Sequence, residues 1–178
     1  MPPTLRCSLI ALALLLGACR GDPIHYHSLS PAQPAGQAHS GLDIQVEQVS
    51  VPPQVDRTQM VIRQGNSGLA ILETEWWGAS LADELHSSLN EQLSNPGAPK
   101  LLLRVDVQRF DSIPGLYARM DVQWRLRNQG NEARVLTCRS SLQTPAASSI
   151  DELVTAHQNN IRQFVGLVEQ AASRNACP

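Results

Sequence analysis

The chain has 178 residues, of which 14 are Lys or Arg and 16 are Asp or Glu, so its formal net charge is −2. Nucleic-acid-binding domains typically carry a strong surplus of basic residues, and this balance argues against that class. The length corresponds to one domain of ordinary size with enough chain to bury a hydrophobic core.

The first 18 residues have the three parts of a secretory signal peptide. A basic residue follows the amino terminus, an apolar stretch covers residues 8–16, and two small residues precede Cys19. Crossing a bilayer takes about 20 apolar residues, so this stretch is too short. The order leucine, two small residues, cysteine is a lipobox, which directs cleavage between Ala18 and Cys19 and acylation of the cysteine sulfur. We predict a signal peptide at residues 1–18; an ordinary secretory signal cut nearby is the alternative.

Acylation at Cys19 determines how firmly the mature chain is held in a bacterial envelope. Each buried methylene of an acyl chain such as palmitate contributes about 0.8 kcal/mol, and two or three chains make the anchor effectively permanent. We predict a lipidated tether at residues 19–23 and a domain at residues 24–178. If the first strand begins near Ile24, the tether spans about 14 Å at most, so the domain sits almost against the membrane.

Alternation of apolar and polar residues predicts strands in the first half of the domain. A first element covers residues 24–29, and a loop rich in Pro, Ala, Gly and Gln follows over residues 30–41. Residues 42–51 predict a strand with one buried face and a bulge where the alternation slips. Residues 60–63 and 69–73 flank a Gly-Asn-Ser-Gly turn, which predicts a short hairpin.

The period then changes to that of a helix. Leucines recur every fourth residue from Leu81 to Leu93, and Ser80 and Asp83 form a capping pair at the start. This pattern predicts an amphipathic helix over residues 80–94 that packs on a sheet.

In the second half of the domain, the sequence predicts a meander of three strands followed by a long helix. Residues 101–107, 120–126 and 133–143 alternate in polarity, and turn-rich segments separate them. A serine and glutamate capping box opens the last helix, residues 150–172, which is about 35 Å long and has a wide apolar stripe. We predict a single compact domain of the α/β or α+β class, with one mixed, largely antiparallel sheet and two main helices.

Two cysteines remain in the mature domain besides Cys19, namely Cys138 and Cys177. An oxidising compartment favours a bridge between them, which would contribute about 4 kcal/mol in the chain-entropy model. The alternative is a buried Cys138 and a reactive thiol at Cys177.

The titratable residues do not form a recognisable catalytic or metal-binding motif. His25 and His27 flank Tyr26, but no third ligand follows at close spacing, so we predict no metal site. His86 and His157 fall on helices, where we expect polar flank positions. The sequence has no Gly-x-Ser-x-Gly elbow, Walker loop, HExxH or paired CxxC motif. We therefore predict no catalytic residue, no cofactor and no enzymatic activity.

Arginines are frequent at outward positions of the meander. They form either a docking surface for a partner or anionic head groups, or cross-strand pairs with acids, and we favour the pairs. The arginines are Arg119, Arg125, Arg127, Arg134 and Arg139, and the acids are Asp106, Asp121 and Glu132. Trp76 and Trp77 are either a binding platform or core residues, and we favour the core.

Single residues spaced along nearly all of the mature chain form a pattern, from Tyr26 and Pro52 through Trp77 and Leu81 to Trp124. This pattern resembles the PqiC family, also called the YmbA family, of ABC-type transport auxiliary lipoproteins. The usual Arg-Trp-Ala-Glu-Pro-Leu motif at the first helix lacks its arginine, glutamate and proline here. We expect structural roles for most of the matching residues. They include Tyr26, Leu29, Pro52, Arg57, Trp77, Leu81, Phe110, Asp111, Trp124 and His157.

This resemblance implies a fold similar to the N-terminal domain of TolB and a non-catalytic role. Members work with an MCE-domain protein and its inner-membrane partners to move lipids between the membranes, and a ring of identical subunits is one form we consider. By the enterobacterial sorting rule, Arg20 after the lipidated cysteine implies the outer membrane, with inner-membrane anchoring as the alternative. Two other functions remain open, an accessory of outer-membrane assembly or lipopolysaccharide transport, and an envelope hydrolase.

Overall fold

The computed structural model describes residues 21–32, 41–128 and 131–178, with only the backbone at 131–134. The order of elements in this part of the chain is β1 (His25–His27), β2 (Asp43–Ser50), β3 (Gln59–Gln64), β4 (Gly68–Trp77), α2 (Leu81–Leu93), β5 (Lys100–Ile113), β6 (Tyr117–Asn128), β7 (Asn131–Pro145) and α3 (Ile150–Arg174). The predicted α+β class with two main helices is confirmed.

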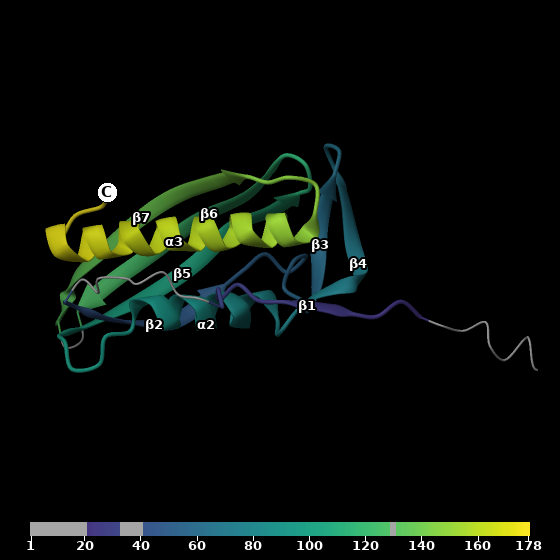
Figure 1. Ribbon diagram of the computed structural model, residues 1–178. Helices are drawn as coiled ribbons and strands as arrows, with labels where there is room; N and C mark the ends of the chain where they lie inside the picture. Colours follow the sequence, from purple (N-terminus) through teal and green to yellow (C-terminus); the bar gives the residue numbers. More distant parts are fainter. Residues whose placement is uncertain (1–20, 33–40, 129–130) are drawn as a thin grey trace, which may run out of the picture.

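The strands form two sheets, where we expected one. A four-stranded sheet has the order β2-β5-β6-β7, and a three-stranded sheet has the order β1-β4-β3. The predicted hairpin of β3 and β4 pairs with β1 and stands at one end of the larger sheet (Figure 1). Alternation indicates which face of a strand is buried, but it does not indicate which strand lies beside it.

The larger sheet contains the predicted antiparallel meander of β5, β6 and β7. β2 runs parallel to β5, and the predicted bulge lies between Val46 and Gln48. Because a parallel neighbour requires a long crossover, the chain passes through the hairpin and α2 between these two strands.

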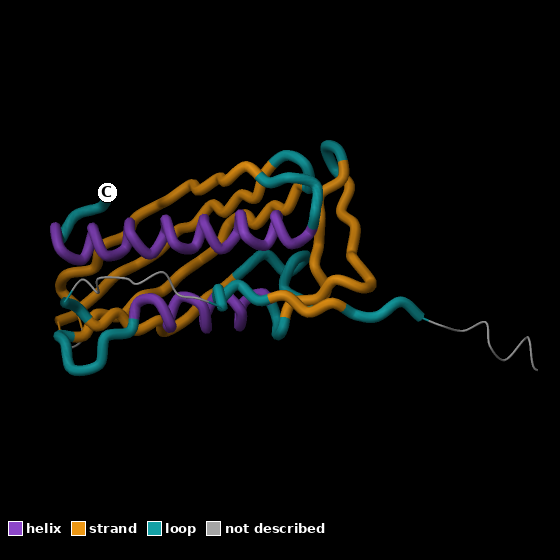
Figure 2. Tube along the Cα trace, viewed as in Figure 1, coloured by secondary structure: helices purple, strands orange, loops and turns teal. Residues whose placement is uncertain are grey.

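Both helices lie on one face of the larger sheet (Figure 2). α2 packs along β2, and α3 crosses β6 and β7. The serine side chains of Ser80 and Ser149 accept hydrogen bonds from the backbone N–H groups of Asp83 and Glu152, as the capping pattern predicted. Among the described helices, none is long and apolar enough to cross a membrane.

The core lies between the larger sheet and the two helices. Trp124 of β6 meets Phe164 of α3 edge to face, with ring centroids 5.8 Å apart. Asn160 of α3 is fully buried, and its side chain donates to the carbonyl oxygen of Ala118 at 3.0 Å and accepts from the Thr144 hydroxyl at 2.7 Å. These contacts hold α3 in register on β6 and β7, because a buried amide is costly without both partners.

A disulfide joins Cys138 of β7 to Cys177 in the tail after α3. Asn175 adopts a left-handed conformation with φ of 52°, which ends α3 and returns the tail towards the sheet. The two Cα atoms are 5.6 Å apart.

Candidate functional site

Both helices lie on the same face of the four-stranded sheet, and no other described helix covers the opposite face (Figure 2). Along β5 and β6, residues such as Val105, Val122 and Trp124 face the helices and are buried, and their neighbours point to the other side. We call this other side the open face. Its described charged side chains are Glu47, Arg104, Asp106, Arg109, Asp111, Arg119, Asp121, Arg125, Arg127 and Arg139.

The open face therefore carries six arginines and four carboxylates, whereas the whole chain has a net charge of −2. Side chains along a strand point alternately to the two faces of a sheet, so the register of the strands places this surplus of positive charge on one face. The opposite face is occupied by the apolar core.

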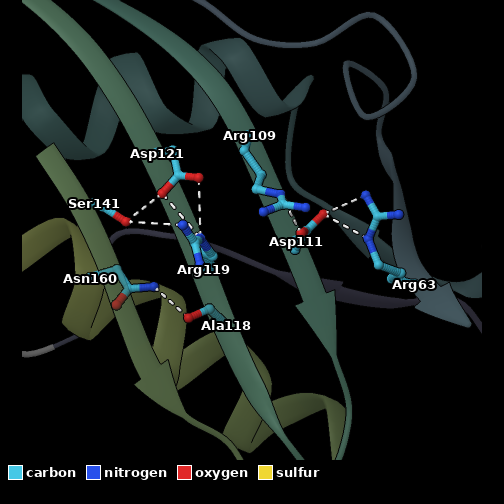
Figure 3. Close-up of polar contacts among 8 residues, drawn as sticks. All are labelled: Arg63, Arg109, Asp111, Ala118, Arg119, Asp121, Ser141 and Asn160. Carbon is cyan, nitrogen blue, oxygen red and sulfur yellow. Dashed lines mark hydrogen bonds and ion pairs between the residues drawn. The ribbon is translucent and has the colours of Figure 1, made fainter. Parts of the chain in front are cut away.

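Several of these arginines form ion pairs, although not the predicted cross-strand pairs, since Arg119 and its partner Asp121 both lie on β6. Arg127 and Arg104 both donate to Glu47, at 2.6 and 3.3 Å, and the hydrogen bond from Arg127 is the main reason that the pKa of Glu47 falls below its usual range. Arg119 and Ser141 both donate to Asp121, at 3.1 and 2.6 Å (Figure 3). We expected the acids on the meander itself, but Glu47 lies on β2, which the sequence did not place beside β5.

Asp111 is the most buried acid on the open face, with a side chain that is 5% exposed. Figure 3 shows it between two arginines from different sheets. Arg63 of β3 donates to its Oδ1 through Nε and Nη2, at 2.9 and 2.7 Å, and Arg109 of β5 lies 2.8 Å from its Oδ2. Asp111 thereby ties the small sheet to the end of the large one.

Arg125 and Arg139 are exposed, and neither has an ion pair with a described residue. Arg139 lines a shallow hollow of about 500 Å³ together with Arg119 and Ser141. Arg125 lines a second hollow with Arg104. The side chains of Arg134 and Glu132 lie outside the described residues. The open face thus combines paired arginines with two that form no ion pair within the described part of the chain.

His157 lies in the core, so its predicted polar flank position is wrong. Its ring is 1% exposed and stacks on Phe110, with centroids 4.0 Å apart and planes 7° from parallel. Burial lowers its pKa to about 3, so the imidazole is neutral near pH 7. The sequence did not indicate this burial, because histidine is a polar residue and is not expected within the apolar stripe of a helix. His86, in contrast, is half-buried on α2, with Nε2 3.1 Å from the Val46 carbonyl oxygen.

Ser112 and His157 share a hydrogen bond of 2.8 Å between Oγ and Nε2, the distance of a nucleophile and its base. In the described part of the chain, Nδ1 of His157 has no hydrogen-bond partner, so no carboxylate orients the ring. Ser112 is itself buried. With His157 1% and Ser112 2% exposed, the hydrogen bond between them lies in the core, where it satisfies both polar side chains.

His25 and His27 of β1 each contact one oxygen of Glu75 on β4. The distances are 3.1 Å from Nδ1 of His25 to Oε1 and 2.6 Å from Nε2 of His27 to Oε2. Burial alone would raise the pKa of Glu75, but the hydrogen bonds from the two histidines outweigh it and lower this pKa. Among the described residues, no three His, Cys, Asp or Glu side chains are grouped to hold a metal ion.

The sequence profile of one family, described as ABC-type transport auxiliary lipoprotein component, matches residues 27–168. The chain belongs to this family. The resemblance found in the sequence is thereby confirmed, and the protein is an auxiliary lipoprotein of a transport system in the bacterial envelope.

Two solved structures have the same fold as this auxiliary lipoprotein. One is an uncharacterized protein with 19% identity, which covers 85% of this chain and 99% of its own with a TM-score of 0.66. The other is a Xanthomonas campestris protein of family DUF330 with 18% identity, 83% and 94% coverage and a TM-score of 0.64. No curated protein matches the chain.

The matching residues of the auxiliary lipoprotein lie mostly in its core. Leu29, Trp77, Leu81, Phe110 and Trp124 are buried. Arg57 and Pro52 lie in the half-buried segment between β2 and β3, and Tyr26 on β1 is exposed. Ala18 and Cys19, the predicted cleavage and acylation positions, lie outside the described residues.

The buried, neutral His157 makes the auxiliary lipoprotein sensitive to acid. In the unfolded chain His157 takes up a proton below about pH 6.5, whereas in the folded protein it does so only near pH 3. The free energy of unfolding therefore falls as the pH drops through this window. When the pH is lowered from about 7 to about 5, the free energy of unfolding should fall by about 2 kcal/mol less in His157→Phe than in the wild type. Guanidinium unfolding at both pH values measures this difference. Equal losses in both proteins would contradict the prediction.

Proposed function

We propose that this auxiliary lipoprotein is the membrane-anchored, non-catalytic docking component of an intermembrane lipid transport system that contains an MCE-domain protein. The observation that carries the proposal is the open face, a broad exposed sheet surface with surplus arginines in a protein of a transport auxiliary family. Electrostatic complementarity would then favour an acidic surface on the partner.

The proposal assigns a part to each segment of the chain. Residues 1–18 are the signal peptide, residues 19–23 carry the acyl chains on Cys19, and residues 24–178 form the domain that the partner reaches. Arg20 supports anchoring in the outer membrane, with the domain in the periplasm. No step of chemistry is assigned to the domain, and no cofactor is needed for docking.

Co-purification from membranes in mild detergent tests the proposal. An MCE-domain protein and its inner-membrane partners should be recovered with the lipoprotein, and the native mass of the complex would reveal a ring of identical subunits. Recovery of an outer-membrane protein in place of the MCE-domain protein would support an assembly or lipopolysaccharide-transport accessory. Repeated failure to recover an MCE-domain protein would overturn the proposal.

Single charge reversals locate the contact. Arg125→Glu and Arg139→Glu each change one exposed arginine that pairs with no described residue, so the fold should be retained and recovery of the partner reduced several-fold. Arg162→Glu is the matched control, because Arg162 is an exposed arginine on α3, on the helical side of the molecule. Equal recovery with all three variants would place the contact away from the open face.

Anchoring is tested separately by Cys19→Ser, which removes the acylated sulfur. We expect loss of lipid labelling, loss of stable membrane retention and loss of transport function, with the domain still folded. A Cys19→Ser variant that complements a deletion strain fully would show that the anchor is dispensable.

A further inference from the structure

Large apolar side chains that remain exposed are concentrated at one end of this protein. Among the described residues, six large hydrophobic side chains are between 41% and 66% exposed. Five belong to β1 and its approach, β4, and the turn between β5 and β6, and the sixth, Val135, lies on β7. We call the group of five the apolar end; it consists of Ile24, Tyr26, Leu69, Ile71 and Leu116.

These segments come together because the small sheet stands at the end of the large one where β5 finishes (Figure 1). Arg63 on β3 reaches Asp111 near the end of β5, and this contact holds the hairpin beside the β5–β6 turn. The N–H of Gly115 in that turn donates to the carbonyl oxygen of Ala147, which precedes α3. β1 is the outer strand of the small sheet, next to β4.

The described chain also begins at this end. In Figure 1 the segment before β1 leaves the body beside the small sheet. Six residue steps separate Cys19 from His25, so their Cα atoms lie within about 22 Å of each other in any conformation. An acyl chain on Cys19 therefore keeps the apolar end, and not the far end with Val135, close to the bilayer.

We propose that the apolar end rests in the interface of the bilayer that holds the lipid anchor, so that the domain has a defined orientation. This inference rests on the proposed acylation of Cys19. Monomeric proteins seldom expose grouped apolar side chains without a contact for them, and the tether supplies the bilayer as the nearest one.

Tyr26 of the apolar end and its neighbour Trp76 on β4 have the chemistry of a membrane interface. The rings of Tyr26 and Trp76 meet edge to face, with centroids 6.2 Å apart. The indole N–H of Trp76 donates to the carbonyl oxygen of Glu73 at 2.9 Å. Tyr and Trp with an apolar body and a satisfied polar tip are enriched at the level of lipid head groups.

The charges at this end indicate that apolar contact, and not attraction to anionic lipid, provides the binding. Glu73 is exposed on β4, and Asp151 at the start of α3 has a side chain that is 89% exposed. These carboxylates would be repelled by a strongly anionic surface. The partner surface is therefore a bilayer with zwitterionic head groups.

Trp76 is a natural probe for the experiment, because Trp77 and Trp124 are buried in the core. The lipidated protein is reconstituted into phosphatidylcholine vesicles with or without bromine on the acyl chains, and tryptophan emission is compared. We expect brominated lipid to remove the Trp76 part of the emission, and Trp76→Phe to abolish this loss. The double variant Trp76→Phe, Val135→Trp carries the probe at the far end and should show no loss.

Flotation of the same vesicles separates the two hypotheses. If the protein does not float with the vesicles, the proposed anchor fails and the inference fails with it. If it floats but emission from Trp76 is equal in brominated and ordinary lipid, the anchor stands and the orientation is overturned, which leaves a protein contact as the cover of the apolar end. Quenching of the Val135→Trp probe in place of Trp76 would also overturn it.

Discussion

Replacing Arg63 and Arg109 together by methionine is expected to lower the free energy of unfolding by about 3–5 kcal/mol. These are the two arginines that pair with the buried carboxylate of Asp111. Methionine keeps much of the apolar length of each side chain but removes both arginine partners, so the carboxylate stays buried without a direct ion pair. Arg63→Met alone should cost about 1–3 kcal/mol, because Arg109 remains.

Arg104→Met is the matched control for Arg63→Met. Arg104 also shares a carboxylate with a second arginine, but Glu47 is 23% exposed and water can replace the lost donor. We expect a cost below about 1 kcal/mol. The measurement is guanidinium unfolding followed by circular dichroism. If Arg63→Met and Arg104→Met cost the same, burial of the carboxylate is not what makes the Asp111 contacts important.

Loss of the bridge between Cys138 and Cys177 should have an effect of similar size. The two residues are 39 positions apart, and in the chain-entropy model a loop of this length is worth about 4 kcal/mol. Cys177→Ser should therefore unfold at a lower guanidinium concentration than the wild type. The native structure should change little, because Cys177 lies in the exposed tail after α3.

Reduction provides the control for this prediction. Reductant should lower the stability of the wild type to that of Cys177→Ser and leave the variant unchanged. Two free thiols in the unreduced mature protein, besides any acylated cysteine, would show that the bridge does not form in solution.

Elements with strong local signals were predicted closely. The capping serines Ser80 and Ser149 begin both helices, because a cap depends on residues only three positions apart. The Gly-Asn-Ser-Gly turn forms the predicted hairpin, and Gly65 adopts φ of 61°, a conformation that glycine reaches without strain. The bulge in β2 likewise follows from a break in alternation over a few residues.

Apart from the bridge between Cys138 and Cys177, which the sequence offered as one of two alternatives, contacts between distant parts of the chain were not predicted. Glu47 and Arg127 are 80 positions apart in the sequence. They meet because β5 pairs with β2 on one side and with β6 on the other. The sequence did not predict a role for Arg63, because a single arginine in a hairpin has no distinctive pattern and its partner Asp111 is distant in the chain. His157 was assigned to a polar flank, although its neighbours Phe110 and Ser112 on β5 make a buried place for it.

The order of residues alone predicted the lipobox and determined the polarity of each strand and the approximate ends of both helices, because these depend on neighbours within one or two turns of chain. The family resemblance followed from the same spacing. The division into two sheets, the surplus of arginines on the open face and the gathering of apolar residues beside the tether arise from strand pairing across long separations. Many pairings satisfy the same alternation, and packing of the whole core against the helices selects one of them.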